Sequence, residues 1–79
     1  KMEAPELNLD QSFADNLKNF QGKFVVINLM SGGEIKGFVK EVRSIFLRLE
    51  KIADRDYYDA MIRLDQISAI EVQVRGLNK

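Results

Sequence analysis

Cysteine and histidine are both missing from this 79-residue chain, and Pro5 is its only proline. Without these residues the chain has no thiolate nucleophile, no histidine-based triad and no disulfide to staple its fold. The carboxylates and lysines that remain fall in no recognisable catalytic arrangement. We therefore expect a protein that acts by binding, not an enzyme, and one that needs no cofactor.

An excess of charge is also missing. Twelve Lys and Arg residues balance twelve Asp and Glu residues, so the formal net charge is zero. Strong non-specific binding to nucleic acid depends on excess positive charge. The zero net charge excludes such an excess for the chain as a whole, but a local basic patch would still supply it. The longest apolar run, Phe24 to Ile27, is far shorter than a membrane span. No signal-peptide pattern is visible, and we expect no membrane partner. The lack of cysteine fits a cytoplasmic protein.

A chain of this length forms one domain. We expect an irregular N-terminal lead over residues 1–8, a single domain over residues 9–76 and a C-terminal tail over residues 77–79. In so small a domain, the free energy gained by apolar burial barely offsets the entropy lost on ordering the chain. Such domains commonly gain stability by associating with copies of themselves, so we expect a homo-oligomer.

One short helix is predicted near the N-terminus, over about residues 10–20. Ser12 has an acidic residue at capping-box spacing, and Asp10 competes with it as the N-cap. Gly22 supplies a natural stop. Apolar residues recur at helical spacing and form a stripe that we expect to cover the core: Phe13, Leu17 and Phe20.

After Gly22 the apolar pattern changes from helical to strand-like. Gly32 and Gly33 fit a hairpin turn, and Gly37 marks a bend or a close approach of another backbone. The first strand is apolar on both faces, so we expect it to be buried on two sides for most of its length. The predicted fold is mostly β, with an N-terminal helix followed by a five-stranded, strongly bent antiparallel sheet or small open barrel. The predicted strands cover residues 23–31, 34–43, 44–52, 60–64 and 67–74.

Two segments resemble the motifs of the Sm-like superfamily, which includes Sm, LSm and Hfq proteins. Gly22 to Glu50 is similar to the first Sm motif, and Ile62 to Ile70 is similar to the second. The resemblance implies an SH3-like barrel and a ring of six or seven subunits, in which the fourth strand of one subunit pairs with the fifth strand of the next. Few charges in these two strands oppose such edge pairing. The expected interface residues are Ala60, Met61, Ile62, Leu64, Ile70, Val72 and Val74.

The same resemblance implies that RNA bases are held near the pore, by the loop between strands two and three and by the corner of the second motif. Arg63 and Asp65 of the second motif are retained, whereas Leu64 replaces its glycine and Arg43 replaces the first-motif aspartate. The Hfq pattern is also incomplete, because the chain has no histidine. The sequence therefore matches the fold of this family better than it matches the family's RNA site. The candidate RNA-binding residues are Arg43, Ser44, Phe46, Arg63 and Asp65.

Two of these candidates, Arg63 and Phe46, have a structural alternative. A ring of arginines at Arg43 and Arg63 would bind phosphate or carboxylate groups in a bidentate manner. Alternatively, Arg63 pairs with Asp65 or with a carboxylate of a neighbouring subunit and only stabilises the ring. Phe46 would stack on a base or, as is commoner, belong to the core.

The segment Ala53 to Asp59 is a charged loop. Its three aspartates lack the glycine and the distal glutamate of a calcium loop, so a solvated loop tip is the better interpretation and no metal is expected. Tyr57 and Tyr58 would stack on a base or on a partner side chain, or pack at the base of the fourth strand.

Two functions follow from these observations. The first is a ring-forming protein that binds short single-stranded RNA near its pore. The second is an oligomeric scaffold that binds other proteins and has little or no affinity for RNA. The neutral composition, the substituted base pocket and the acidic loop from Asp54 to Asp59 favour the second. The family resemblance and the retained Arg63 and Asp65 favour the first.

Overall fold

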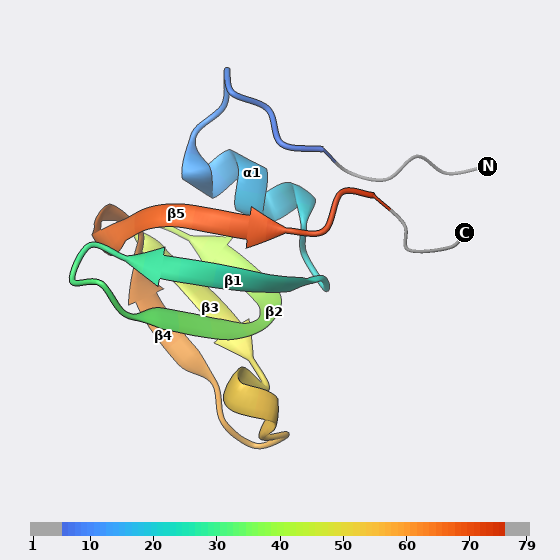
Figure 1. Cartoon of the computed structure of the whole chain (residues 1–79), viewed down its shortest axis with the longest axis vertical. Helices are drawn as coiled ribbons and strands as arrows, with labels where there is room; N and C mark the ends of the chain where they lie inside the picture. Colours follow the sequence, from blue (N-terminus) through green and yellow to red (C-terminus); the bar gives the residue numbers. More distant parts are fainter. Residues whose placement is uncertain (1–5, 76–79) are drawn as a thin grey trace.

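The computed structural model describes residues 6–75, so most of the expected N-terminal lead and the expected C-terminal tail lie outside the described residues. One short helix precedes five strands, which confirms the mostly β prediction (Figure 1). In the described part of the chain, no helix is long and apolar enough to cross a membrane. The elements in chain order are α1 (Phe13–Asn19), β1 (Phe24–Leu29), β2 (Glu34–Arg43), β3 (Phe46–Glu50), the 3-10 turn η1 (Ile52–Asp54), β4 (Ala60–Arg63), the 3-10 turn η2 (Leu64–Gln66) and β5 (Ile67–Val72).

The five strands form one antiparallel sheet in the order β4-β3-β2-β1-β5. The sheet is not closed: within residues 6–75, β4 and β5 each have a single neighbouring strand. The long strand β2 belongs to both halves of the sheet, since it pairs with β1 up to Phe38 and with β3 from Phe38 onward. Its pairing with β3 shifts register between Val39 and Glu41, and such a bulge increases the local bend.

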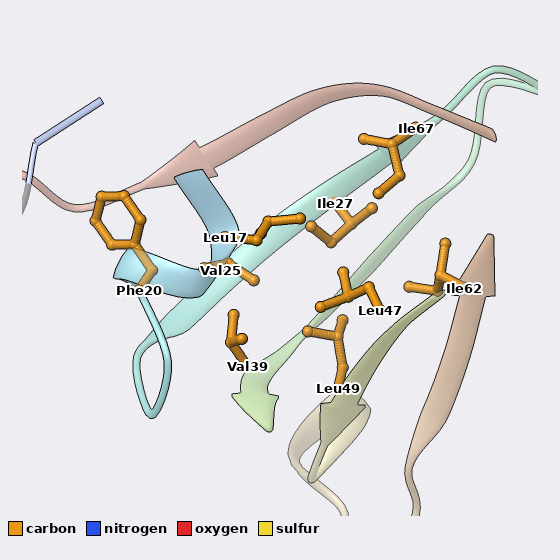
Figure 2. Close-up of a cluster of buried hydrophobic side chains, with 9 residues drawn as sticks. All are labelled: Leu17, Phe20, Val25, Ile27, Val39, Leu47, Leu49, Ile62 and Ile67. Carbon is orange, nitrogen blue, oxygen red and sulfur yellow. The ribbon is translucent and has the colours of Figure 1, made fainter. Parts of the chain in front are cut away.

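The core lies between the bent sheet and α1, as Figure 2 shows. Leu17 and Phe20 of the helix are buried in it, so the predicted helical cover is confirmed for these two residues. It is wrong for Phe13, which is 40% exposed because it lies at the first turn of α1, beyond the core. The nine core residues are Leu17, Phe20, Val25, Ile27, Val39, Leu47, Leu49, Ile62 and Ile67.

The helix is shorter than predicted and begins after Ser12. The hydroxyl of Ser12 accepts a hydrogen bond from the backbone N–H of Asp15 at 3.1 Å, which confirms Ser12 as the N-cap. Asp10 is not the N-cap, because it sits in a turn where its N–H donates to the side chain of Asn8 at 2.9 Å. After the helix, Gly22 adopts a φ of +83°, a conformation that favours glycine.

The prediction that the first strand is buried on two sides is wrong. Val25 and Ile27 are fully buried, but Phe24 is 46% exposed, because no layer of the described structure covers the outer face of β1. The Phe24 ring instead packs edge-on against Phe38, with 5.5 Å between ring centres. The expected start of the third strand is also wrong, since Ile45 lies in the β2–β3 turn and is 53% exposed.

Gly37 lies where another backbone approaches closely, as predicted. A Cβ atom at this position would stand 2.8 Å from the carbonyl oxygen of Glu50. We expect Gly37→Ala to reduce the free energy of unfolding by about 1–3 kcal/mol, because β2 or β3 must shift to make room. Chemical denaturation measures this loss. Gly33→Ala is the matched control, since nothing lies within 4 Å of a Cβ there; equal losses for the two variants would contradict the steric explanation.

Candidate functional site

The β2–β3 turn and the β4–β5 corner meet at one end of the sheet. The backbone N–H of Leu64 donates to the carbonyl oxygen of Ile45 at 2.8 Å and joins the two segments. Arg43 is paired with Phe46, and Phe46 is paired with Arg63, across β2, β3 and β4. Side chains of directly paired residues lie on the same face of a sheet. Arg43, Phe46 and Arg63 therefore form a row on the outer face, which we call the Arg–Phe–Arg row.

Phe46 at the centre of this row is half-buried and does not belong to the core cluster. A hollow of about 460 Å³ opens beside it on the outer face of the sheet. The structure thus places three of the predicted RNA candidates, Arg43, Ser44 and Phe46, around one hollow, and Arg63 next to it. The other residues that line the hollow are Glu41, Arg48, Asp59, Ala60 and Met61.

Arg48 and Asp59 were not among the predicted site residues. Arg48 stands two residues after Phe46 on β3, so strand alternation alone places both side chains on one face. Asp59 reaches the hollow from the far end of the charged loop, across 11 positions of sequence. Only the pairing of β3 with β4 brings it there, and the sequence carries no local signal for that pairing.

Both arginines of the row already have carboxylate partners. Arg43 donates to Glu41 at 2.9 Å, and Arg63 donates to Asp65 at 2.6 Å. The side chain of Arg43 is 82% exposed, and those of Arg63 and Asp65 are 57% and 60% exposed. Exposed ion pairs of this kind stabilise a fold by only about 0–1 kcal/mol. An incoming phosphate can therefore replace these carboxylates at little cost.

A third ion pair fastens the charged loop to the sheet. The Arg48 guanidinium donates to one carboxylate oxygen of Asp59 at 2.8 and 3.1 Å. The backbone N–H of Lys51 donates to the other oxygen at 3.4 Å. The hydrogen bond from Arg48 holds the pKa of Asp59 below its usual range, and the same bond raises the pKa of Arg48.

This depressed pKa predicts how stability changes in acid. A carboxylate whose pKa is lower in the folded than in the unfolded chain stabilises the fold above its unfolded pKa, near ~3.9, and this contribution is lost as the pH falls through the folded value. We expect Asp59→Asn to lose less stability than the wild type on acidification below about pH 4. Thermal unfolding from about pH 2 to about pH 6, the range in which carboxyl groups titrate, measures this difference between variant and wild type. Arg48→Gln should flatten the curve in the same way, and an unchanged acid limb in both variants would refute the role of this pair.

The two tyrosines of the charged loop occupy different environments. The Arg55 guanidinium lies 4.0 Å from the ring centre of Tyr58, and the Tyr58 carbonyl accepts a hydrogen bond from Ile52 at 2.9 Å. Tyr58 is thus held within the loop, whereas Tyr57 is 95% exposed at its tip. Among residues 6–75, no group of three or more acidic side chains is placed to hold a metal ion.

The predicted interface residues lie along the two open edges of the sheet. On β4, Met61 is 72% exposed, but Ile62 is 5% exposed and belongs to the chain's own core, so only its backbone is available to a partner. On and beyond β5, Ile70, Val72 and Val74 are half-buried and pack against the core. Ala60 and Leu64 are likewise half-buried, at the start of β4 and in η2.

Neither a scan of the chain against models of known families nor a search of curated proteins finds a match.

Proposed function

We propose that this chain is a divergent Sm-like protein that assembles into a homo-oligomeric ring and binds short single-stranded RNA at the Arg–Phe–Arg row. The observation that carries this proposal is the row itself: Phe46 is paired across the strands with Arg43 on one side and with Arg63 on the other, on the outer face of the sheet. It supplies the two contacts that single-stranded nucleic acid needs, a stacking platform for a base and cations for phosphates. The protein acts by binding and not by catalysis.

The open sheet supports the assembly part of the proposal. The strands with one free edge among the described residues, β4 and β5, are the two that the Sm-like resemblance pairs between subunits. Two different edges that pair head-to-tail form a ring when the rotation between subunits closes. Free edges of this kind otherwise invite uncontrolled aggregation, so a ring also protects them.

Ring symmetry would compensate for the low charge of the chain. Each subunit contributes only two arginines to the row, and the net charge of the chain is zero. Repetition around a ring would present one row per subunit to a continuous strand of RNA, so weak contacts would add through effective concentration. Affinity should therefore depend on assembly and on the length of the oligonucleotide.

Multi-angle light scattering, with and without equimolar oligo-U and oligo-A, tests the proposal. The expected result is a mass of about six or seven subunits with RNA co-eluting at low salt, and a binding constant that falls as salt rises, because phosphate contacts release counterions. A monomer at all concentrations would refute the ring. A ring that leaves both oligonucleotides unbound at low salt would refute RNA binding.

The second function, a scaffold ring with little RNA affinity, is favoured by one observation. Each arginine of the row is already neutralised by a carboxylate of its own chain, Glu41 or Asp65. A nuclease-treated pull-down separates the two functions. Partners that survive removal of RNA support the scaffold, and partners that disappear with the RNA support the first proposal.

A further inference from the structure

Two phenylalanine side chains form an exposed pair on the outer face of the sheet, apart from the Arg–Phe–Arg row. Phe24 of β1 and Phe38 of β2 are directly paired, so their side chains share this face. Their rings pack edge to face, with 5.5 Å between centres and 69° between planes, and the two residues remain 46% and 37% exposed. Because each ring restricts the other, they offer a preorganised aromatic surface to a flat ligand group. We call this surface the Phe24–Phe38 pair.

Lysine side chains lie beside this pair. The Lys51 ammonium is 5.9 Å from the centre of the Phe38 ring, and in the described part of the chain it takes part in no ion pair with a carboxylate. Lys40 follows Phe38 on β2, and its half-exposed side chain lies 3.8 Å from the Glu50 carboxylate. Exposed ion pairs of this kind contribute little to stability. Both ammonium groups are therefore available to an anionic ligand.

The Phe24–Phe38 pair and the Arg–Phe–Arg row lie on one continuous face. Glu50 of β3 is paired with Phe38, and strand alternation places Glu50 and Phe46 on the same face. The stretch of β2 from Phe38 to Arg43 is about 17 Å long. Single-strand binding sites on small β-barrel folds extend over about 4–16 nucleotides, so one oligonucleotide can contact both surfaces.

The chemistry of this surface favours single-stranded nucleic acid over a protein partner. The cores of protein–protein interfaces are depleted in lysine, whereas two lysines stand beside these rings. Aromatic rings on an open sheet stack unpaired bases, and neighbouring cations bind the phosphates between them. We infer that the Phe24–Phe38 pair is a second stacking platform, with Lys40 and Lys51 as its phosphate contacts, and that one RNA strand runs from this pair to the row. This inference rests on the proposed function and extends its site across β1 and β2.

A fluorescent reporter tests the inference directly. The chain contains no tryptophan, so Phe38→Trp introduces a single one into the pair. Oligo-U or oligo-A of about 16 nucleotides at low salt should quench its emission by stacking, over the same concentrations at which anisotropy shows binding. Phe13→Trp is the matched control: Phe13 is 40% exposed on α1, on the other side of the core, and its emission should not change. Bound oligonucleotide that leaves Phe38→Trp emission unchanged would overturn the inference and leave the pair to a protein partner.

The double variant Phe24→Leu with Phe38→Leu provides an independent test, because it removes both rings and keeps apolar side chains. It should weaken binding of the same oligonucleotides by about 10-fold through lost stacking, and Phe13→Leu should leave binding unchanged. Wild-type affinity in the double variant would also overturn the inference. If Arg43→Ala with Arg63→Ala still weakens binding in that case, the row and the proposed function stand. A wild-type protein that binds neither oligonucleotide at low salt would instead refute the proposed function itself, so the two failures are distinguishable.

Discussion

Replacement of both arginines of the row, Arg43→Ala with Arg63→Ala, is expected to weaken binding of single-stranded RNA by about 30-fold. A charge-assisted hydrogen bond to phosphate contributes about 1.5–3 kcal/mol, and release of the existing carboxylate offsets up to about 1 kcal/mol of it. A net loss of about 1 kcal/mol per arginine gives roughly this factor. Fluorescence anisotropy with labelled oligo-U and oligo-A measures it at a fixed, stated salt concentration.

The salt dependence of binding separates the roles of the row residues. Loss of two phosphate contacts should reduce the slope of log K against log salt by about 1.4, since each contact on a single strand contributes about 0.7. Phe46→Leu removes the aromatic face but keeps an apolar side chain, so it should weaken binding by about 5- to 10-fold, through lost stacking, with the slope unchanged. Wild-type affinity in Phe46→Leu would exclude Phe46 as a stacking platform.

A matched control guards against a general charge effect. Lys18 and Lys36 are exposed and each lies near a carboxylate of its own chain, at 4.0 and 3.6 Å, but neither belongs to the row. The double variant Lys18→Ala with Lys36→Ala changes the net charge by the same amount. Equal loss of RNA affinity in this control and in the arginine variant would show that the row has no special role.

The sequence pattern was sufficient where a residue acts through its local backbone or its own strand. Gly22 ends the helical segment with a positive φ, and β2 runs from Glu34 to Arg43 as predicted. Leu47 and Leu49 alternate into the core as strand periodicity requires. Each of these features depends on a single segment, so the local sequence is sufficient to predict it.

Errors arose where burial depends on what a distant segment covers. Phe24 and Phe13 are apolar at correctly spaced positions, yet both are exposed, since no described segment packs over the outer face of β1 or the first turn of α1. Apolar spacing shows that a helix or strand has an apolar face. It does not show whether another part of the fold packs on that face.

The candidate site could be predicted only in part for a related reason. Arg43, Phe46 and Arg63 were each identified from their place in the motifs, but their arrangement in one row depends on the register of β2, β3 and β4. The β-bulge near Val39 helps to set which residues of β2 and β3 are paired, and the local sequence carries no signal for it. The buried Asn16 side chain, which accepts a hydrogen bond from the backbone N–H of Asn8 and donates one to its carbonyl, was not predicted, because an asparagine in a helix gives no signal for a partner eight residues away.

The second large effect is expected at the proposed subunit interface, where Met61→Asp should convert the proposed ring to monomers. Met61 is 72% exposed on the open edge of β4, so the substitution should leave the folded monomer unchanged. In the proposed ring, however, the carboxylate would lie where the open edge of β4 pairs with β5 of the next subunit, and it would be taken out of water there. The lost methionine contact alone is worth about 1.5–3 kcal/mol, and desolvation of the charge adds to it.

A change of at least about 3 kcal/mol per interface corresponds to a rise of more than about 100-fold in the half-dissociation concentration, which light scattering on a dilution series detects. Thermal unfolding at a concentration where both proteins are monomeric should give the same midpoint for variant and wild type. Tyr57→Asp is the matched control, because Tyr57 is 95% exposed in the charged loop and belongs to neither β4 nor β5. A ring of wild-type stability in Met61→Asp would exclude β4 from the interface, and with it the pairing of β4 and β5 on which the proposed ring depends.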